Sequence, residues 1–163
     1  MYLGLEIAGK MNEIDKISFK RKLVELCKDH LNSSAEKTKL AIDEAQSSAN
    51  EYGQPKDRYD SYRAQVLRKR DMFGKQLLKT MDQIACLDQI GVDKLHYKVE
   101  FGSVVLTDKQ HMFVATGIGK VKFDEADIFI ISPHVPVFEA LKDKTSGDVI
   151  DFRGSNIKIA EVF

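Results

Sequence analysis

Apolar and small residues recur at alternating intervals of three and four between Ile17 and Asn50, which is the spacing of a heptad seam. Charged residues such as Lys20, Lys22 and Glu25 are assigned to positions mainly off this seam, as expected for a solvent-facing surface. The pattern predicts one helix nearly 50 Å long at about 1.5 Å per residue. The seam comprises Val24, Cys27, Leu31, Ser34, Thr38, Ala41, Ala45 and Ser48.

A second seam with the same spacing follows and predicts a second helix of similar length, with Gly91 as its stop signal. Between the helices, residues 50–57 include Gly53 and Pro55, which favour a turn. The small side chains late in the first seam favour close helix packing toward that turn. The second seam comprises Tyr59, Tyr62, Val66, Arg70, Phe73, Leu77, Thr80, Ile84 and Leu87.

After Gly91 the helical period gives way to short β-type runs separated by turn signals such as Asp108-Lys109 and Gly117–Gly119. Val137–Asp143 is expected to form one short helix. The expected strands are 99–107, 111–116, 128–131, 149–152 and 157–162. The sequence therefore predicts an α+β protein with two parts: an antiparallel coiled-coil hairpin over residues 11–91, with its tip at about 50–58, and a small antiparallel β domain over 92–163.

Composition narrows the function classes. The 163 residues have a formal net charge of zero, and each half has only a small net charge, so neither resembles an autonomous nucleic-acid-binding module. The sequence shows no apolar run long enough for a membrane span and no signal-peptide pattern at residues 1–10, so a cytoplasmic location without membrane association is expected. The role of residues 1–10 stays open.

The two cysteines and four histidines show no metal-ligand spacing and are interpreted as packed or surface residues. These residues are Cys27, Cys86, His30, His96, His111 and His134.

Several short motifs occur in a fixed order from residue 41 to residue 152. Ala41–Ala45 precedes the turn, Phe101–Val105 opens the second half, and Ile131–Pro136 reads Ile-Ser-Pro-His-Val-Pro. Ala140-Leu141 and Gly147-Asp148 follow. This order, over about residues 20–163, resembles the Gre-type family of bacterial transcription elongation (transcript cleavage) factors, although Val135 replaces a serine of the family's loop.

The resemblance implies an FKBP-like fold for the second half and an accessory factor rather than an enzyme. Such a factor binds the rim of the RNA polymerase secondary channel and meets RNA and DNA only within the elongation complex. It would need no cofactor of its own, because its tip carboxylates act on Mg²⁺ in the polymerase active site. Monomeric behaviour is expected.

Glu51 and Asp57 are the candidate metal-facing carboxylates under this resemblance. Their spacing departs from the family's tip, and the segment leading to Tyr59 is longer than the family pattern. A simpler interpretation is that Asp57 caps the second helix and Glu51 is a solvated turn residue.

The candidate polymerase-contacting residues lie in the second half of the chain. Ser132, Pro133, Val135 and Pro136 match the family's docking loop. Two acidic residues just upstream are added as possible contacts; these are Glu125 and Asp127. The simpler interpretation is that the prolines stiffen a turn and the acids solvate a loop.

Three other functions stay open. A secondary-channel factor with an altered tip would inhibit or modulate polymerase without RNA cleavage. An FKBP-like second half would suit a prolyl isomerase, provided that its aromatic residues line a pocket. The heptad seams alone also suit a dimerising coiled-coil adaptor.

Overall fold

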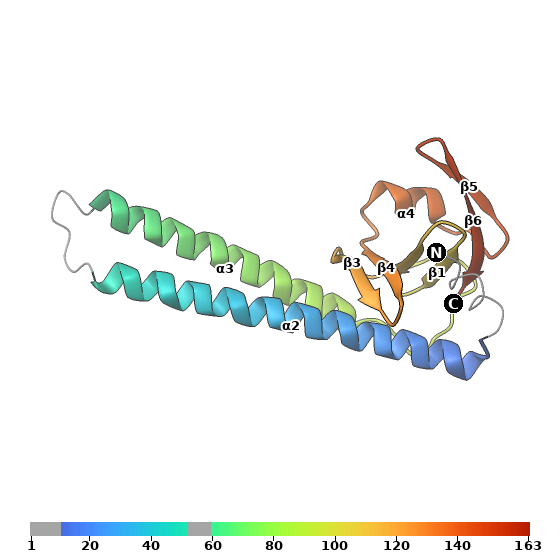
Figure 1. Cartoon of the computed structure of the whole chain (residues 1–163), viewed down its shortest axis with the longest axis horizontal. Coiled ribbons are helices and arrows are strands. Elements are labelled where there is room, and N and C mark those ends of the chain that lie inside the picture. Colours follow the sequence, from blue (N-terminus) through green and yellow to red (C-terminus); the bar gives the residue numbers. More distant parts are fainter. Residues whose placement is uncertain (1–10, 52–59) are drawn as a thin grey trace. The chain divides into compact units, whose positions relative to one another are not determined.

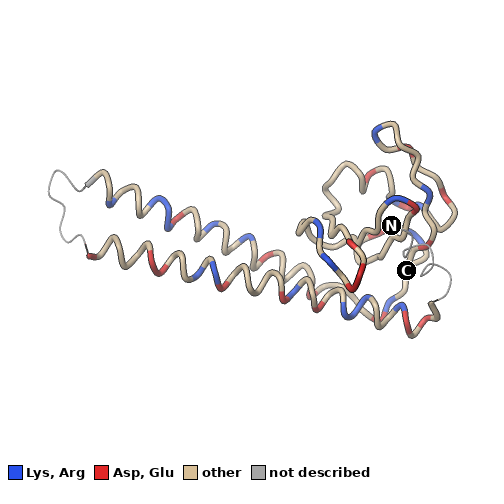
Figure 2. Tube along the Cα trace, in the orientation of Figure 1, with Lys and Arg blue, Asp and Glu red and all other residues tan. Residues whose placement is uncertain are grey.

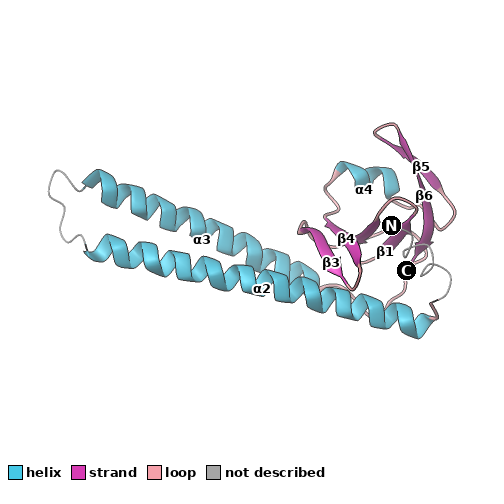
Figure 3. Cartoon of the chain, in the orientation of Figure 1, coloured by secondary structure: helices cyan, strands magenta, loops and turns pink. Residues whose placement is uncertain are grey.

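The computed structural model describes residues 11–51 and 60–163. The chain divides into two compact units. Residues 28–85 form a unit that we call the hairpin unit, and residues 11–27 with 86–163 form the sheet unit. These units follow contacts in space, whereas the expected boundary at residues 91 and 92 followed the change of sequence period. The α+β class, with long helices followed by a sheet, is confirmed (Figure 3).

Two long helices, α2 (Glu13–Glu51) and α3 (Asp60–Asp88), run antiparallel, and their parts within residues 28–85 make up the hairpin unit (Figure 1). At the start of α2, the Asp15 N–H donates to Asn12 Oδ1 at 2.9 Å and the Asn12 N–H donates to Asp15 Oδ2 at 3.3 Å. These reciprocal bonds satisfy amides that a helix start otherwise leaves unpaired. No proline or glycine interrupts the sequence from residue 13 to residue 51, so α2 continues without a break. None of the helices in the described ranges is long and apolar enough to cross a bilayer.

The predicted first seam is a packed face of α2, whereas the second seam is packed only in part, and its first residue, Tyr59, lies outside the described residues. No residue of the first seam is exposed, and Leu31 and Thr38 are buried. On α3, Thr80 and Leu87 are buried, whereas Tyr62 is 44% exposed. A hydrogen bond between the two helices shows which residues of α2 and α3 lie opposite each other. Arg70 Nη1 of α3 donates to Gln46 Oε1 of α2 at 2.7 Å.

One assignment along the first helix was wrong. Lys20 was assigned to the solvated surface, but its side chain is 0% exposed. It precedes Val24 by four residues and Cys27 by seven, so it continues the seam toward the start of the helix. The pattern missed this position because it counts apolar residues and lysine is charged.

Six strands form one sheet in the order β3-β4-β2-β1-β6-β5. All neighbouring pairs are antiparallel except β2 and β4, which are parallel, a detail that the expectation of an antiparallel sheet did not include. The strands are β1 (Val104–Thr107), β2 (His111–Val114), β3 (Gly119–Phe123), β4 (Ala126–Ile131), β5 (Val149–Phe152) and β6 (Ser155–Val162).

Both faces of this sheet are covered, which explains why its central strands are continuously apolar. The short helix α4 (Pro136–Leu141) packs Phe138 and Leu141 into a core that includes Val105 and Met112. The residues that alternate with these along the strands, such as Val104, are buried on the opposite face. The start of α2 contributes a side chain to that second core through Phe19, as described below.

Several strand bounds differ by two residues from the sequence-based expectation, and the larger differences are at two strands. β1 begins at Val104 instead of residue 99, because Gly102 adopts a φ of +88° and Ser103 Oγ donates to the Glu100 carbonyl at 2.7 Å. β3 was not predicted, since Gly117–Gly119 was interpreted only as a turn. The alternation of lysines with Val121 and Phe123 is nevertheless a strand signal that follows it directly.

Candidate functional site

The candidate docking loop, residues 132–136, connects β4 to α4 and is ordered by local hydrogen bonds. Ser132 Oγ accepts from the His134 N–H at 3.2 Å, and the Ser132 carbonyl accepts from the Val135 N–H at 3.2 Å. Pro136 is the first residue of α4, where its missing N–H costs nothing and its fixed φ favours the helix. The loop is therefore shaped before any partner binds.

The loop residues differ in what they offer a partner. Val135 is half-buried and packs against the core beneath α4, so its main role is structural. Pro136 and the neighbouring His134 are exposed, and Ser132 and Pro133 are half-buried. A partner contacting this loop would meet prolines and an imidazole on a rigid turn.

The two acidic candidates lie at the other end of β4. Glu125 is exposed in the turn before the strand, and Asp127 pairs with Lys120 of β3 at 3.0 Å. Ser132 follows the end of the same strand, so roughly 20 Å of extended chain separates it from Glu125. The structure therefore does not bring the acids and the docking loop into one cluster.

Sequence reasoning missed the segment that does lie beside the docking loop. Because β2 and β4 are parallel, their carboxyl ends meet at one edge of the sheet. The Ala115 N–H donates to the Ile131 carbonyl at 2.8 Å, and a Cβ on Gly117 would lie 3.8 Å from Ser132 Cβ. Residues 115–117 and 132–136 thus form one edge. The parallel pairing that joins them has no local sequence signal.

At the other candidate site, Glu51 is the last residue of α2 and is exposed. Within the described residues, the last turn of α2 carries no basic residue, so this carboxylate lies at the negative end of the helix dipole without a cation in that turn. Asp57, its proposed companion, lies outside the described residues. Within the described ranges, no three or more His, Cys, Asp or Glu side chains are grouped so that they could hold a metal ion.

The two long helices differ in the order of their charges. Figure 2 shows acidic and basic residues mixed along α2, whereas most charged residues in the first two thirds of α3 are basic. Between Ser61 and Lys79, the only acidic residue is Asp71, and Arg70 pairs with it at 2.6 Å. The basic residues of this stretch are Arg63, Arg68, Lys69, Arg70, Lys75 and Lys79.

No protein-family model and no curated protein matches this chain. Solved structures that are similar to it include two that can be compared in detail. One is described as the transcription factor Gfh1, with 17% identity and a TM-score of 0.34 over 83% of this chain and 92% of the other. The second is GreA factor homolog 1 (Gfh1) of Thermus thermophilus, with 16% identity and a TM-score of 0.31 over 83% and 94%. At such values neither similarity supports an argument about function.

The cysteines and histidines occupy the packed and surface positions expected of them. Burial raises the pKa of the Cys27 thiol to about 12, and it also raises the pKa of Cys86. A thiol with a raised pKa carries little of the reactive thiolate. Of the histidines, His96 is buried and His111 is half-buried, whereas His30 and His134 are exposed.

The aromatic residues of the sheet unit mainly fill its cores. Phe113, Phe138 and Phe163 are buried, and Phe123 is 7% exposed. Tyr97 is 79% exposed and stands alone among the large aromatic side chains of this unit in facing solvent so fully, within the described residues. These positions favour a packing role over the aromatic-lined pocket that a prolyl isomerase needs.

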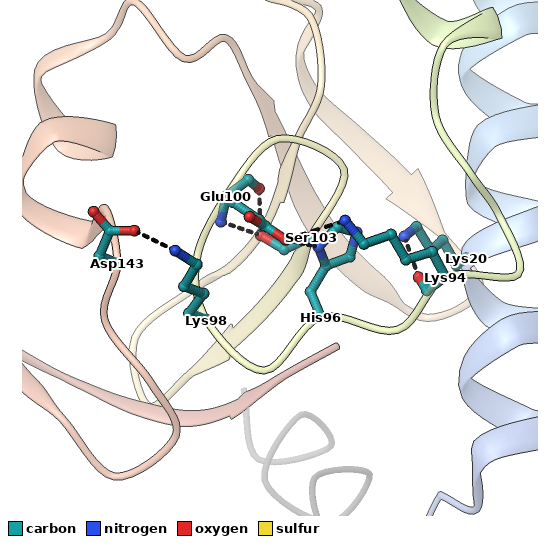
Figure 4. A network of polar contacts seen from close by, with 7 residues as sticks. All are labelled: Lys20, Lys94, His96, Lys98, Glu100, Ser103 and Asp143. Carbon is teal, nitrogen blue, oxygen red and sulfur yellow. Dashed lines mark hydrogen bonds and ion pairs between the residues drawn. The ribbon is translucent and has the colours of Figure 1, made fainter.

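A polar network that the sequence did not predict surrounds Lys20 (Figure 4). Lys20 Nζ donates to the Lys94 carbonyl at 2.8 Å, and His96 Nδ1 lies 2.6 Å from Glu100 Oε1. Burial lowers the pKa of Lys20 to about 8, with a further lowering by the nearby charge of Lys94. Burial also lowers the pKa of His96, whereas the hydrogen bond from His96 lowers the pKa of Glu100.

Proposed function

We propose that this chain is a transcription elongation factor that binds RNA polymerase at its secondary channel and acts on backtracked complexes. The observation that carries the proposal is the hairpin unit, which is long and only two helices wide. The 29 residues of α3 span about 44 Å, and each helix is about 10–12 Å across with its side chains. A body of this width is suited to entering a channel.

The sequence motifs support the same partner. The order of Ala41–Ala45, Phe101–Val105, Ile131–Pro136 and Gly147-Asp148 resembles the Gre-type family. In this proposal, the edge formed by residues 115–117 and 132–136 contacts the channel rim. Glu125 and Asp127 would then make separate contacts, since they lie at the far end of β4.

The charges of the hairpin unit suit the interior of an elongation complex. The excess of basic over acidic residues between Ser61 and Lys79 of α3 favours an environment rich in nucleic-acid phosphates. Glu51, at the negative end of α2, favours a nearby cation, and a carboxylate is a suitable oxygen ligand for Mg²⁺. We propose that Glu51, with Asp57, faces the Mg²⁺ of the polymerase active site, while the polymerase remains the catalyst.

The test adds purified protein to a halted, backtracked polymerase complex and follows the RNA 3′ end and the rate of elongation on restart. Shortened RNA identifies a cleavage factor. Slowed elongation without shortening of the RNA identifies an inhibitor. The altered spacing of the tip carboxylates favours this outcome. If saturating protein neither shortens the RNA nor slows elongation, the proposed function is contradicted.

A matched pair of variants assigns the tip. Glu51→Gln removes the charge of the candidate ligand, and Glu44→Gln removes an exposed charge from the same helix about two turns earlier. We expect Glu51→Gln to reduce the RNA cleavage rate at least tenfold with unchanged polymerase binding, and Glu44→Gln to have little effect. Equal activity of the two variants and wild type would remove Glu51 from the metal-facing role.

A further inference from the structure

The start of α2 belongs, by its contacts, to the sheet unit. Residues 13–27 of this helix group with the sheet, whereas residues 28–51 group with the hairpin unit. One uninterrupted helix therefore serves both units.

Several side chains fasten this first part to the sheet unit. Phe19 makes edge-on contacts with Phe123 and Phe163, with ring centroids 4.7 and 5.8 Å apart. Lys16 forms an ion pair with Glu161 and also lies 5.7 Å from the centroid of the Phe163 ring. These contacts reach the edge strand β3 and the carboxyl end of the chain.

Lys20 fastens the same part of α2 to a third region, the connection between α3 and β1. Its side chain is 0% exposed, and Nζ donates to the Lys94 carbonyl at 2.8 Å (Figure 4). A buried ammonium group costs free energy unless it is hydrogen-bonded, and removal of the partner leaves that cost uncompensated.

The connection that receives this bond is itself held firmly. His96 lies against Glu100 at 2.6 Å, and Lys98 pairs with Asp143 at 3.0 Å on the side toward α4 (Figure 4). Gly102 packs its backbone on the His96 ring, because an added Cβ would lie 3.4 Å from His96 Nε2. The Lys94 carbonyl is therefore a fixed acceptor.

We propose that Lys20 is a positioning residue, which locks the start of α2 to residues 94–100 within the sheet unit, and that the action of the protein on polymerase depends on this lock. The proposal rests on the proposed function, since it makes the action of the tip on polymerase depend on a contact made in the sheet unit. Loss of this contact leaves the docking residues and the tip residues unchanged. We therefore expect the protein to bind polymerase as before but to have a smaller effect on it.

The test compares Lys20→Met with Lys22→Met. Methionine keeps the unbranched stem of Lys20 but removes the donor and the charge, and Lys22 is an exposed lysine on the same helix. The first readout is amide hydrogen exchange in the full-length protein. We expect exchange in residues 93–97 to quicken about tenfold in Lys20→Met, the change for one lost hydrogen bond of about 1.4 kcal/mol, with no change in Lys22→Met.

The second readout is a titration of each variant into the halted polymerase complex, with the half-saturating concentration and the maximal effect measured separately. We expect Lys20→Met to keep its half-saturating concentration within about twofold and to lose at least fivefold in maximal effect. A full maximal effect, unchanged exchange, or a parallel loss of binding and effect would overturn the positioning role. An inactive wild type would instead overturn the proposed function, and this inference with it.

Discussion

The two units of this chain differ in the size of their hydrophobic cores. The sheet unit buries large side chains on both faces of its sheet, including Phe113, Met112 and Leu141, each no more than 2% exposed. The hairpin unit has only the line between two helices, where Ala45 and Ser48 are half-buried and Thr80 bonds back to the Gln76 carbonyl at 3.1 Å. Burial of apolar area is the main source of stability, so the hairpin unit is the weaker of the two.

The difference suits a division of labour. A thin two-helix core keeps the hairpin unit narrow, at the expense of stability, whereas the sheet unit can hold a rigid loop at residues 132–136. The helix α2 joins them, and its start shares the deeper core. If the two cores differ in this way, the same kind of substitution should have different consequences in the two units.

The largest contrast is expected from removing one phenylalanine ring in each unit. Phe113→Ala empties a fully buried position and should reduce the free energy of unfolding by about 3–5 kcal/mol. Phe73→Ala, at a half-buried seam position of α3, should cost less than about 2 kcal/mol. Urea unfolding followed by circular dichroism measures both. Equal losses would contradict the contrast between the cores.

The next largest effect concerns pH and Lys20. Its pKa falls from 10.5 unfolded to about 8 folded, so the folded protein binds fewer protons than the unfolded chain between these values. Stability should therefore rise with pH across this window, by about 3 kcal/mol from this group alone. The measurement is the difference in unfolding free energy between wild type and Lys20→Met at pH 7.5 and pH 10.

That difference isolates Lys20 from groups with the opposite sign. The raised pKa of Cys27 makes stability fall as pH rises above 9, but it does so in both proteins. The lowered pKa values of His96 and Glu100 predict a separate loss of stability in acid, below pH 6.5 and further below pH 4.5. A wild-type minus variant difference that does not change with pH would show that Lys20 is not titrating as a buried amine.

A smaller effect is expected from enlarging a small seam residue. Ala45→Leu forces extra volume into the line between α2 and α3 and should cost about 1–3 kcal/mol. Ser33→Leu adds similar volume at an exposed position of α2 and should change stability by less than about 0.5 kcal/mol. Hydrogen exchange in α3 separates the two variants. If Ala45→Leu leaves the stability unchanged, the space between α2 and α3 at this position is larger than the small seam residues indicate.

The elements that could be predicted from the sequence are those with a long local period. The two seams identified α2 and α3 nearly to their ends, and apolar runs identified five of the strands. The burial of Lys20 could not be predicted because it depends on the Lys94 carbonyl, an acceptor that is distant in sequence. The parallel pairing of β2 with β4 could not be predicted because packing sets the order of the strands. The roles of Glu51 and the docking loop stay predictions, and Asp57 lies outside the described residues.

The central claim is that the end of α2 reaches the active centre of RNA polymerase, and a photo-crosslinker at residue 51 tests it most directly. A second protein carries the crosslinker at exposed Glu36, about four turns nearer the start of the helix. In backtracked complexes, we expect residue 51 to crosslink to the RNA 3′ end or to polymerase residues around the catalytic Mg²⁺, and residue 36 to crosslink elsewhere. Absence of any crosslink from residue 51, or the same products from both positions, would contradict the account.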